Sequence, residues 1–334
     1  MRVPFDEMKS QIKNVFLKYG LDDKTADLCA QIHTESSRDG IYSHGTNRVA
    51  RFVDYIKKGW VDVKAKPEVE KEIGSIAVVN GNMGPGIPNA IFSVNKAIDI
   101  AKNYGVGIVG LHNTTHWMRG GTYGLYAARK GYIAVSWTNT ESCMPPWGGK
   151  DDKLGNNPFV MAAPTEDEPV MIDMAMSQYA YGKLQVTRLA GKQLPYPGGF
   201  DENGNLTTDP APIEKSMRIL PMGYWKGSSF AFMLDILGAI LSNGLAGSEI
   251  DDVGKGSCGG ASQVFIIIDP EKFTNKERIF EIINKEKQHI KESTLDEHSK
   301  SIWYPGEDYV VNKKENDDKG IFVDDSVWKE IKSL

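Results

Sequence analysis

Cysteine is scarce in this chain of 334 residues, and the three that occur lie far apart in the sequence. Cys29, Cys143 and Cys258 have neither the close spacing of a zinc site nor the even number of a disulfide framework. The first residues also lack the pattern of a secretory signal peptide. Together these absences predict a protein of the reducing cytoplasm.

Long apolar runs and basic clusters are also missing. No apolar stretch approaches the length of a membrane-spanning helix, so we expect no contact with a membrane. The formal net charge is -5, which makes nucleic acid a poor partner, although a local arginine can still bind a small anionic substrate. Among the six scattered histidines, His112 and His116 are four apart but lack a third ligand nearby, so no metal site is predicted.

The spacing of apolar residues predicts a mainly helical first third, followed by alternating strands and helices. Helices are expected near 5–19, 24–36, 44–59, 90–101, 229–242 and 275–292. Short, continuous apolar runs occur at 76–79, 106–111, 132–137, 170–176 and 264–268. Such runs are typical of strands in a sheet that is covered on both faces. The pattern therefore predicts an α/β protein, in which the helix over 229–242 is buried.

Two glycine motifs suggest nucleotide binding but stand in the wrong context. Residues 105–110 match G-x-G-x-x-G, which in a dinucleotide-binding turn follows a strand and begins a helix. Here the glycines follow a helix and the motif itself resembles a strand, so Gly105 is better explained as the helix's C-terminal cap. Residues 254–257 lack the upstream glycine of a P-loop. A nicotinamide cofactor would therefore need a different architecture from the Rossmann fold.

The segment 42–48 places a hydroxyl, an imidazole and a guanidinium close together. Ser43 is a candidate N-cap for the helix that follows, and His44 and Arg48 would then share one helix face. An imidazole can deliver a proton near neutral pH, and a guanidinium can hold a carboxylate with two hydrogen bonds. Reduction of a 2-oxo acid requires this pair of functions, whereas the simpler interpretation is a capped helix start with surface side chains.

Three further segments contain candidate functional side chains. The loop 113–121 follows a strand and contains His116 and Arg119, which either belong to a site or include a structural histidine packed under Trp117. Asp173 lies in an apolar run and needs a partner, which is either a ribose hydroxyl or, more commonly, a backbone N–H. Lys226 precedes a helix that Ser228 or Ser229 could cap, leaving N–H groups for an anion, although an ordinary loop is the commoner case.

Two loops have structural explanations. Residues 201–205 resemble the start of a calcium loop but lack its final glutamate, so a tight Asn-Gly turn is expected. Residues 144–148 form a rigid aromatic loop that either shapes a pocket or turns a corner.

Together, the Ser43-His44-Gly45 triplet, the His116 loop, the Asp173 strand, the Lys226 loop and residues 305–307 resemble the malate/L-lactate dehydrogenase family of the non-Rossmann type. The resemblance covers essentially the whole chain, in order. Segments 116–121, 144–148 and 218–227 are similar to one branch in particular, the 2,3-diketo-L-gulonate reductases (3-dehydro-L-gulonate 2-dehydrogenases).

The resemblance implies an α/β fold with a mixed-sheet, non-Rossmann NAD-binding domain over 76–269. A largely helical substrate and dimer domain would comprise residues 1–75 and be completed by 270–334. The protein would be a cytoplasmic homodimer that binds a small sugar acid. It would reduce 2,3-diketo-L-gulonate to 3-dehydro-L-gulonate with NADH, or with NADPH in its place, by hydride transfer to C2.

The resemblance also assigns residues to roles. His44 would be the proton donor, and Ser43, Arg48, His116 and Arg119 would bind substrate. The cofactor would contact Pro169, Val170, Met171, Ile172, Asp173, Met174, Ala175, Trp225, Lys226, Gly306, Glu307 and Asp308. The turn before the first cofactor segment is one residue longer than the family pattern. Same-fold alternatives are malate, lactate or ureidoglycolate dehydrogenases, and an alternative of another class is a non-catalytic sugar-acid binding protein.

Overall fold

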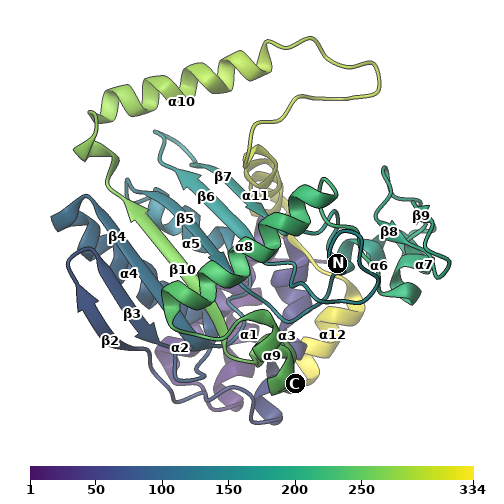
Figure 1. The fold of residues 1–334 in the computed structure, drawn as a ribbon, viewed down its shortest axis with the longest axis horizontal. Helices are drawn as coiled ribbons and strands as arrows, with labels where there is room; N and C mark the ends of the chain where they lie inside the picture. The colour runs from purple at the N-terminus through teal and green to yellow at the C-terminus, as the bar shows by residue number, and fades with distance from the viewer.

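The computed structural model describes residues 1–334 and has a seven-stranded sheet at its centre (Figure 1). Its strand order is β2-β3-β4-β10-β5-β6-β7, in which β3 and β4 are parallel and the other neighbours are antiparallel. This mixed order differs from the parallel, doubly wound Rossmann sheet and confirms the predicted fold class. The strands are β2 (Glu68–Ile73), β3 (Ile76–Asn80), β4 (Val106–Thr114), β5 (Ile133–Thr138), β6 (Phe159–Ala163), β7 (Val170–Met174) and β10 (Ala261–Ile268).

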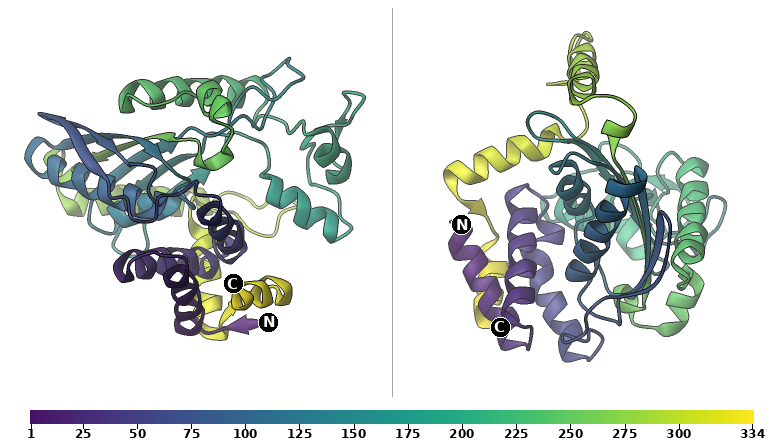
Figure 2. Two further views of the ribbon diagram at one scale, coloured as in Figure 1. Left: turned by 90° about the horizontal axis from the view of Figure 1, so that it is seen from below. Right: turned by 90° about the vertical axis from the view of Figure 1, so that its left-hand side faces the viewer.

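Helices cover both faces of this sheet (Figure 2). Helices α4 (Gly86–Tyr104) and α5 (Gly121–Ala128) lie on one face, and α8 (Trp225–Ser242) lies on the other. Because side chains alternate along a strand, Phe265 and Ile267 of β10 pack beneath α4 while Val264 packs with α8. The expected coverage of both faces is therefore confirmed for the central strands.

The helices at the two ends of the chain share one core. Four of them contribute to it, namely α1 (Phe5–Lys18), α2 (Asp23–Arg38), α3 (Thr46–Lys57) and α12 (Asp325–Ser333), while α11 (Glu307–Lys319) packs against α2 outside this core. Phe16, Phe52 and Trp328 meet in this core, although more than 300 residues separate the first from the last. Strand β1 (Arg2–Val3) also pairs with β11 (Ile321–Phe322), which joins the two termini directly.

The remaining elements lie around this body. A small lobe holds the hairpin β8–β9 and two helices, and the hairpin is closed by the tight turn expected at 201–205. Helix α10 projects from the body and has one buried residue, Ile279 (Figure 1). The bounds are α6 (Tyr181–Leu189), β8 (Gly199–Phe200), β9 (Leu206–Thr207), α7 (Pro210–Ser216), α9 (Gly247–Val253) and α10 (Lys276–Lys291), with 3₁₀ turns η1 (Tyr42–His44), η2 (Gly256–Cys258) and η3 (Pro270–Lys272).

The sequence predictions fail at the start of two helices. Helix α3 begins at Thr46 and its cap position is Gly45, so the prediction that Ser43 caps it is wrong. Helix α8 begins at Trp225, so neither Ser228 nor Ser229 is its cap.

Helix α8 is also not the buried helix that its composition suggests. Phe232, Met233 and Ile240 are all exposed in the single chain. The end of α4 agrees with the prediction, because Gly105 has a φ of 79° and caps the helix.

No single helix has the length and apolar composition of a membrane span. Only the bent pair of α8 and α9, with 77° between the two helices, passes on length and composition.

Candidate active site

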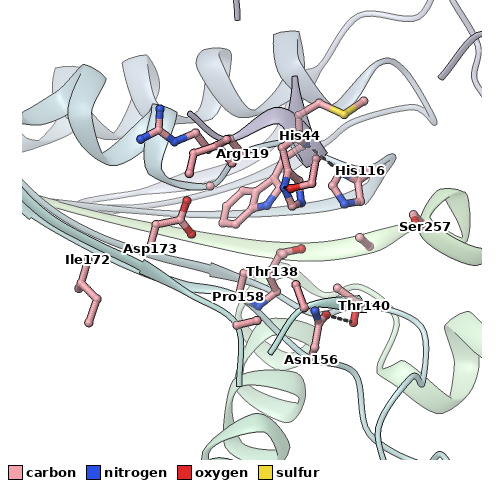
Figure 3. A pocket seen from close by; sticks show the side chains of 18 of the residues that line it. His44, His116, Arg119, Thr138, Thr140, Asn156, Pro158, Ile172, Asp173 and Ser257 are labelled. Carbon is pink, nitrogen blue, oxygen red and sulfur yellow. Dashed lines mark hydrogen bonds between the residues drawn. The ribbon is translucent and has the colours of Figure 1, made fainter. Parts of the chain in front are cut away.

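A cavity of about 770 Å³ lies where the helical part meets the sheet (Figure 3). This volume is within the usual range of about 300–1,000 Å³ for small-molecule sites. Its walls come from segments that are far apart in the sequence, namely 41–44, 116–120, 138–141, 156–158, 171–175, 256–261 and 303–309. The cavity therefore forms only when both ends of the chain and the sheet have come together.

His44 lies on the wall of this cavity, in the 3₁₀ turn η1 that precedes α3. Its Nδ1 is 3.0 Å from the hydroxyl oxygen of Ser43, and no carboxylate forms a hydrogen bond with the ring. Its ring stacks on that of His116, with centroids 5.7 Å apart and planes inclined by 24°. Two of the predicted site residues are thus neighbours, although 72 positions separate them in the sequence.

Gly45 explains why the His44 turn lies so close to α2. A Cβ atom at this position would stand 2.1 Å from the Ser37 hydroxyl oxygen and 2.8 Å from the His33 carbonyl oxygen. The Ser37 hydroxyl accepts a hydrogen bond from the Thr46 N–H at 2.8 Å, so a side chain of α2 satisfies the first turn of α3. Only glycine allows this close approach, and it fixes the turn that presents His44.

Enclosure by the cavity walls, together with the charges of Arg48 and Arg119, lowers the pKa of His44 to about 3. The imidazole is therefore neutral at pH 7 when no ligand is bound. A bound anion would offset the positive neighbours and would favour the protonated ring. Protonation of His44 is thus favoured by an anionic ligand in the cavity.

His116 has a fixed tautomer. The backbone N–H of Met118 donates to its Nδ1 at 2.8 Å, so this nitrogen carries no proton and Nε2 carries the hydrogen. Burial and the neighbouring charge of Arg48 place the pKa of His116 well below its ordinary value. The ring is therefore a neutral hydrogen-bond donor on the cavity wall. This geometry favours a residue of the site over a purely structural histidine packed under Trp117.

Arg48 stands behind the cavity wall. Because His44 precedes α3, the prediction that His44 and Arg48 share one face of this helix is wrong. Nη2 of Arg48 donates to the hydroxyl of Ser257 at 3.4 Å, and this hydroxyl donates to Glu141 at 3.0 Å. Its Nε is buried and has no hydrogen-bond partner in the protein. The substrate-binding role of Arg48 stays a prediction.

Arg119 reaches the cavity but has a partner in the protein. It is 4% exposed, and its Nη1 donates to the carboxylate of Asp39, which is 2% exposed. The sequence analysis did not single out Asp39. Contact between Arg119 and substrate also stays a prediction, and it would have to use the donors that Asp39 leaves free.

Part of the predicted cofactor segment lies on the cavity. Its members there are Met171, Ile172, Asp173, Ala175, Gly306 and Asp308. Asp173 accepts a hydrogen bond from the Gly121 N–H at 2.7 Å, so the commoner of its two expected partners is present. Its second oxygen has no donor in the protein and is available to a ligand hydroxyl.

The other predicted cofactor residues do not line this cavity. Glu307 forms an ion pair with Lys291, and Trp225, with 59% of its surface exposed, stands with Lys226 at the start of α8. The remaining members outside the cavity wall are Pro169, Val170 and Met174. Their role in cofactor binding stays a prediction.

The sequence analysis missed several polar groups on the opposite wall (Figure 3). They are Thr138, Thr140, Glu141, Asn156 and Ser257. Thr138 is the last residue of β5, and Thr140 and Glu141 lie in the loop that follows, where sheet enzymes often place functional groups, so their position in the sequence contained a usable indication. Nothing local indicates Asn156 or Ser257, because only the tertiary fold brings them to the cavity.

Comparison with known proteins agrees with this architecture. The family described as malate/L-lactate dehydrogenase matches residues 3–332. A curated relative from Escherichia coli O127:H6 (strain E2348/69 / EPEC), named 2,3-diketo-L-gulonate reductase, is 40% identical over 335 residues, with 100% of both chains covered.

Solved structures show the same fold. The malate dehydrogenase of Pyrococcus horikoshii OT3 superimposes with a TM-score of 0.90 at 31% identity, covering 99% of this chain and 93% of that one. The sulfolactate dehydrogenase of Methanocaldococcus jannaschii has a TM-score of 0.90 at 29% identity, covering 100% and 96%. The chain therefore belongs to the malate/L-lactate dehydrogenase family and is an oxidoreductase acting on a 2-hydroxy or 2-oxo acid.

Proposed function

We propose that this protein reduces 2,3-diketo-L-gulonate to 3-dehydro-L-gulonate with NADH. The observation that carries the proposal is the pair of stacked imidazoles, His44 and His116, in one cavity with an unsatisfied arginine behind it. The full-length similarity to proteins named 2,3-diketo-L-gulonate reductase supports the choice of substrate.

Four side chains have separate roles in the proposed reduction. Arg48 attracts the substrate carboxylate toward the Ser257 side of the cavity. His116 donates a hydrogen bond from Nε2 to a substrate oxygen, because its Nδ1 is occupied by the Met118 N–H. His44 gives a proton to the C2 oxygen, while Ser43 holds its Nδ1. Proton donation by a positioned group is typically worth about 10²- to 10⁴-fold in rate.

The residues present fit a nicotinamide cofactor. Bound NADH supplies the hydride that reduces C2. The free oxygen of Asp173 can accept from a ribose hydroxyl, and Ile172 and Pro158 add apolar surface to the cavity wall. Asp173 would disfavour a 2′-phosphate by repulsion if it lies beside the adenosine ribose, which is why we propose NADH before NADPH, whereas the charge of Glu168 is already balanced by Arg129 and Lys313.

The test follows NADH and NADPH oxidation against 2,3-diketo-L-gulonate, pyruvate and oxaloacetate. We expect turnover with NADH and the six-carbon acid. Turnover of oxaloacetate or pyruvate alone would instead indicate a malate or lactate dehydrogenase. The name of one structural neighbour, a malate dehydrogenase, agrees with this alternative. Binding of the sugar acid without any cofactor oxidation would indicate a non-catalytic binding protein.

Two variants connect the activity to the site. His44→Ala should lower kcat by about a hundredfold or more and leave NADH affinity near normal. His298→Ala is the matched control, because this side chain is 87% exposed and does not line the cavity. Equal kcat in the two variants would remove His44 from the role of proton donor.

We also propose that the protein is a homodimer of the cytoplasm. Met233, Leu237, Ile240 and Leu241 recur at helical spacing on α8 and are exposed in the single chain. A contiguous exposed apolar face of this kind usually marks an interface, and this one lies outside residues 1–75 and 270–334, the domain to which the resemblance assigns dimer formation. Three free cysteines are consistent with a reducing compartment.

The dimer proposal is tested by light scattering after size-exclusion chromatography. The wild-type protein should have twice the chain mass of 37.0 kDa, and Ile240→Glu should have the mass of a single chain. Ile73→Glu is the control, since Ile73 is similarly exposed but lies on β2. A wild-type mass of one chain, or dissociation by Ile73→Glu alone, would contradict the assignment to α8.

A further inference from the structure

Asp39 lies at a junction that the reduction mechanism leaves unexplained. It follows the last residue of α2 and is 2% exposed. One carboxylate oxygen accepts from Arg119 Nη1, and the other is 3.3 Å from Arg38 Nε. A buried carboxylate bonded to two guanidinium groups is costly to desolvate, so its retention at this position calls for an explanation beyond stability.

The ion pair of Asp39 and Arg119 connects the segments that carry the two imidazoles. Asp39 is five residues before His44, and the turn between them begins with Gly40 at a φ of 87°. Arg119 is three residues after His116, in the loop that follows β4. The pair therefore joins the end of a helix in the helical part to a loop of the sheet, beside the point where the imidazoles stack.

Tyr309 extends the same cluster to the cofactor segment. Its ring lies 5.6 Å from the guanidinium carbon of Arg119, and it is 2% exposed. Its hydroxyl donates to the carbonyl oxygen of Pro169 at 3.0 Å, directly before β7. Asp39, Arg119 and Tyr309, which we call the junction cluster, thus connect the end of α2, which leads into the His44 turn, with the His116 loop and with Pro169 before the strand that contains Asp173.

The backbone around the cluster leaves little freedom. The Arg38 carbonyl oxygen accepts from the side chain of Asn316 of α11 at 2.7 Å, and a Cβ at Gly40 would stand 2.7 Å from Nδ2 of the Asn312 side chain. Helix α11 thus packs against the C-terminal end of α2. Only four residues separate Asp39 from His44, so a shift of Asp39 would displace the His44 turn relative to the His116 loop, to which Arg119 ties Asp39.

We propose that Asp39, acting through Arg119, is a positioning residue for the reduction: it sets the spacing of His44 from His116 and from the cofactor segment. Asp39 touches neither substrate nor cofactor in this arrangement. The inference rests on the proposed function for its kinetic part, but the geometry that it asserts can be tested without turnover.

The first test is Asp39→Asn, which keeps the size of the side chain and one acceptor but removes the charge. We expect kcat to fall between about tenfold and a hundredfold, with KM and NADH affinity within about twofold, because misplacement of a reacting group acts on the chemical step. The uncompensated Arg119 charge should also move the pH dependence of kcat/KM toward lower pH. Asp22→Asn, at the N-cap of the same helix, is the control for a loss of stability alone.

A second variant separates positioning from folding. The double substitution Asp39→Leu with Arg119→Met replaces the buried pair by apolar groups, which is often neutral or stabilising for the fold. We expect its melting temperature to lie near the wild-type value while the ring signals of His44 and His116 stay displaced, a readout that does not depend on contact between Arg119 and substrate. Recovery of kcat together with stability would overturn the proposal and make the pair purely structural.

The third readout is the NMR signal of the His44 and His116 ring carbons in the free protein. Stacked rings shift each other's resonances, so Asp39→Asn should change both signals while Asp22→Asn leaves them in place. Unchanged ring signals in Asp39→Asn would overturn the positioning role. If the wild-type protein fails to reduce the sugar acid but the ring signals still move, the proposed function fails and the positioning inference stands.

Discussion

The low pKa of His44 leads to a specific prediction about pH. A histidine with the ordinary value of 6.5 is protonated in about a quarter of molecules at pH 7, whereas one with a pKa of about 3 is protonated in about one in 10⁴. Reduction consumes one proton, which His44 must acquire as the anionic substrate binds. The rate should therefore fall steadily as the pH rises across the neutral range, without levelling near 6.5.

The assay measures kcat/KM for reduction at saturating NADH, between pH 6 and pH 8. We expect a decrease of about tenfold per pH unit, hence about a hundredfold in total. The carbon-13 signal of the His44 ring in the free protein should show no titration in this range. A plateau below pH 6.5, or a ring that titrates near that value, would refute the reasoning. Arg48→Met should raise the pKa of His44 and so move the plateau of kcat/KM to higher pH, because Arg48 is the principal positive neighbour of His44.

Arg48→Lys should raise KM for the sugar acid by about tenfold or more at unchanged NADH affinity, because an ammonium cannot form two parallel hydrogen bonds; an unaltered KM would count against the carboxylate role. Burial lowers the pKa of His33 to about 4, below the unfolded value of 6.5, so stability is full above 6.5 and about 3 kcal/mol is lost as the pH falls to 4. Urea unfolding at pH 7 and pH 4 should therefore show a smaller acid loss for His33→Phe, and an equal loss would contradict this origin. Gly107→Ala should destabilise the protein by about 1–3 kcal/mol or more, since its Cβ would stand 2.0 Å from the Ala97 carbonyl oxygen, and an unchanged melting temperature would argue against this packing.

Elements with strong local patterns could be predicted from the sequence. The apolar stripe of α4 and its glycine cap predicted the helix and where it ends. The continuous apolar run of β10 predicted a strand buried on both faces. The decoy glycine motif was correctly rejected because local order alone places a helix before it and a strand within it. Strand β6 (Phe159–Ala163) was missed because it has only one β-branched residue, Val160, and ends in two alanines, which are depleted in strands.

Helix starts failed where the cap comes from elsewhere in the structure. The first turn of α3 is satisfied by Ser37, nine residues earlier on another helix, so a rule that looks only at neighbours selected Ser43 instead. The exposed face of α8 was read as buried because composition cannot say whether an apolar helix meets its own core or another surface.

The candidate site was predictable in part. Short motifs and resemblance pointed to His44 and His116, and the structure brings them together. Asp39 and Ser257 could not be found in this way, because each gains its role from a side chain 80 or more positions distant. Long-range partners of this kind leave no local pattern in a single sequence.

The central claim is hydride transfer to C2 of a 2-oxo sugar acid in this cavity. It is tested most directly by a single turnover of 2,3-diketo-L-gulonate with NADH that carries deuterium at C4, in each of its two stereochemical forms. We predict that one form transfers its deuterium to C2 of the product and the other transfers none. Deuterium at C3, or no transfer from either form, would contradict the account.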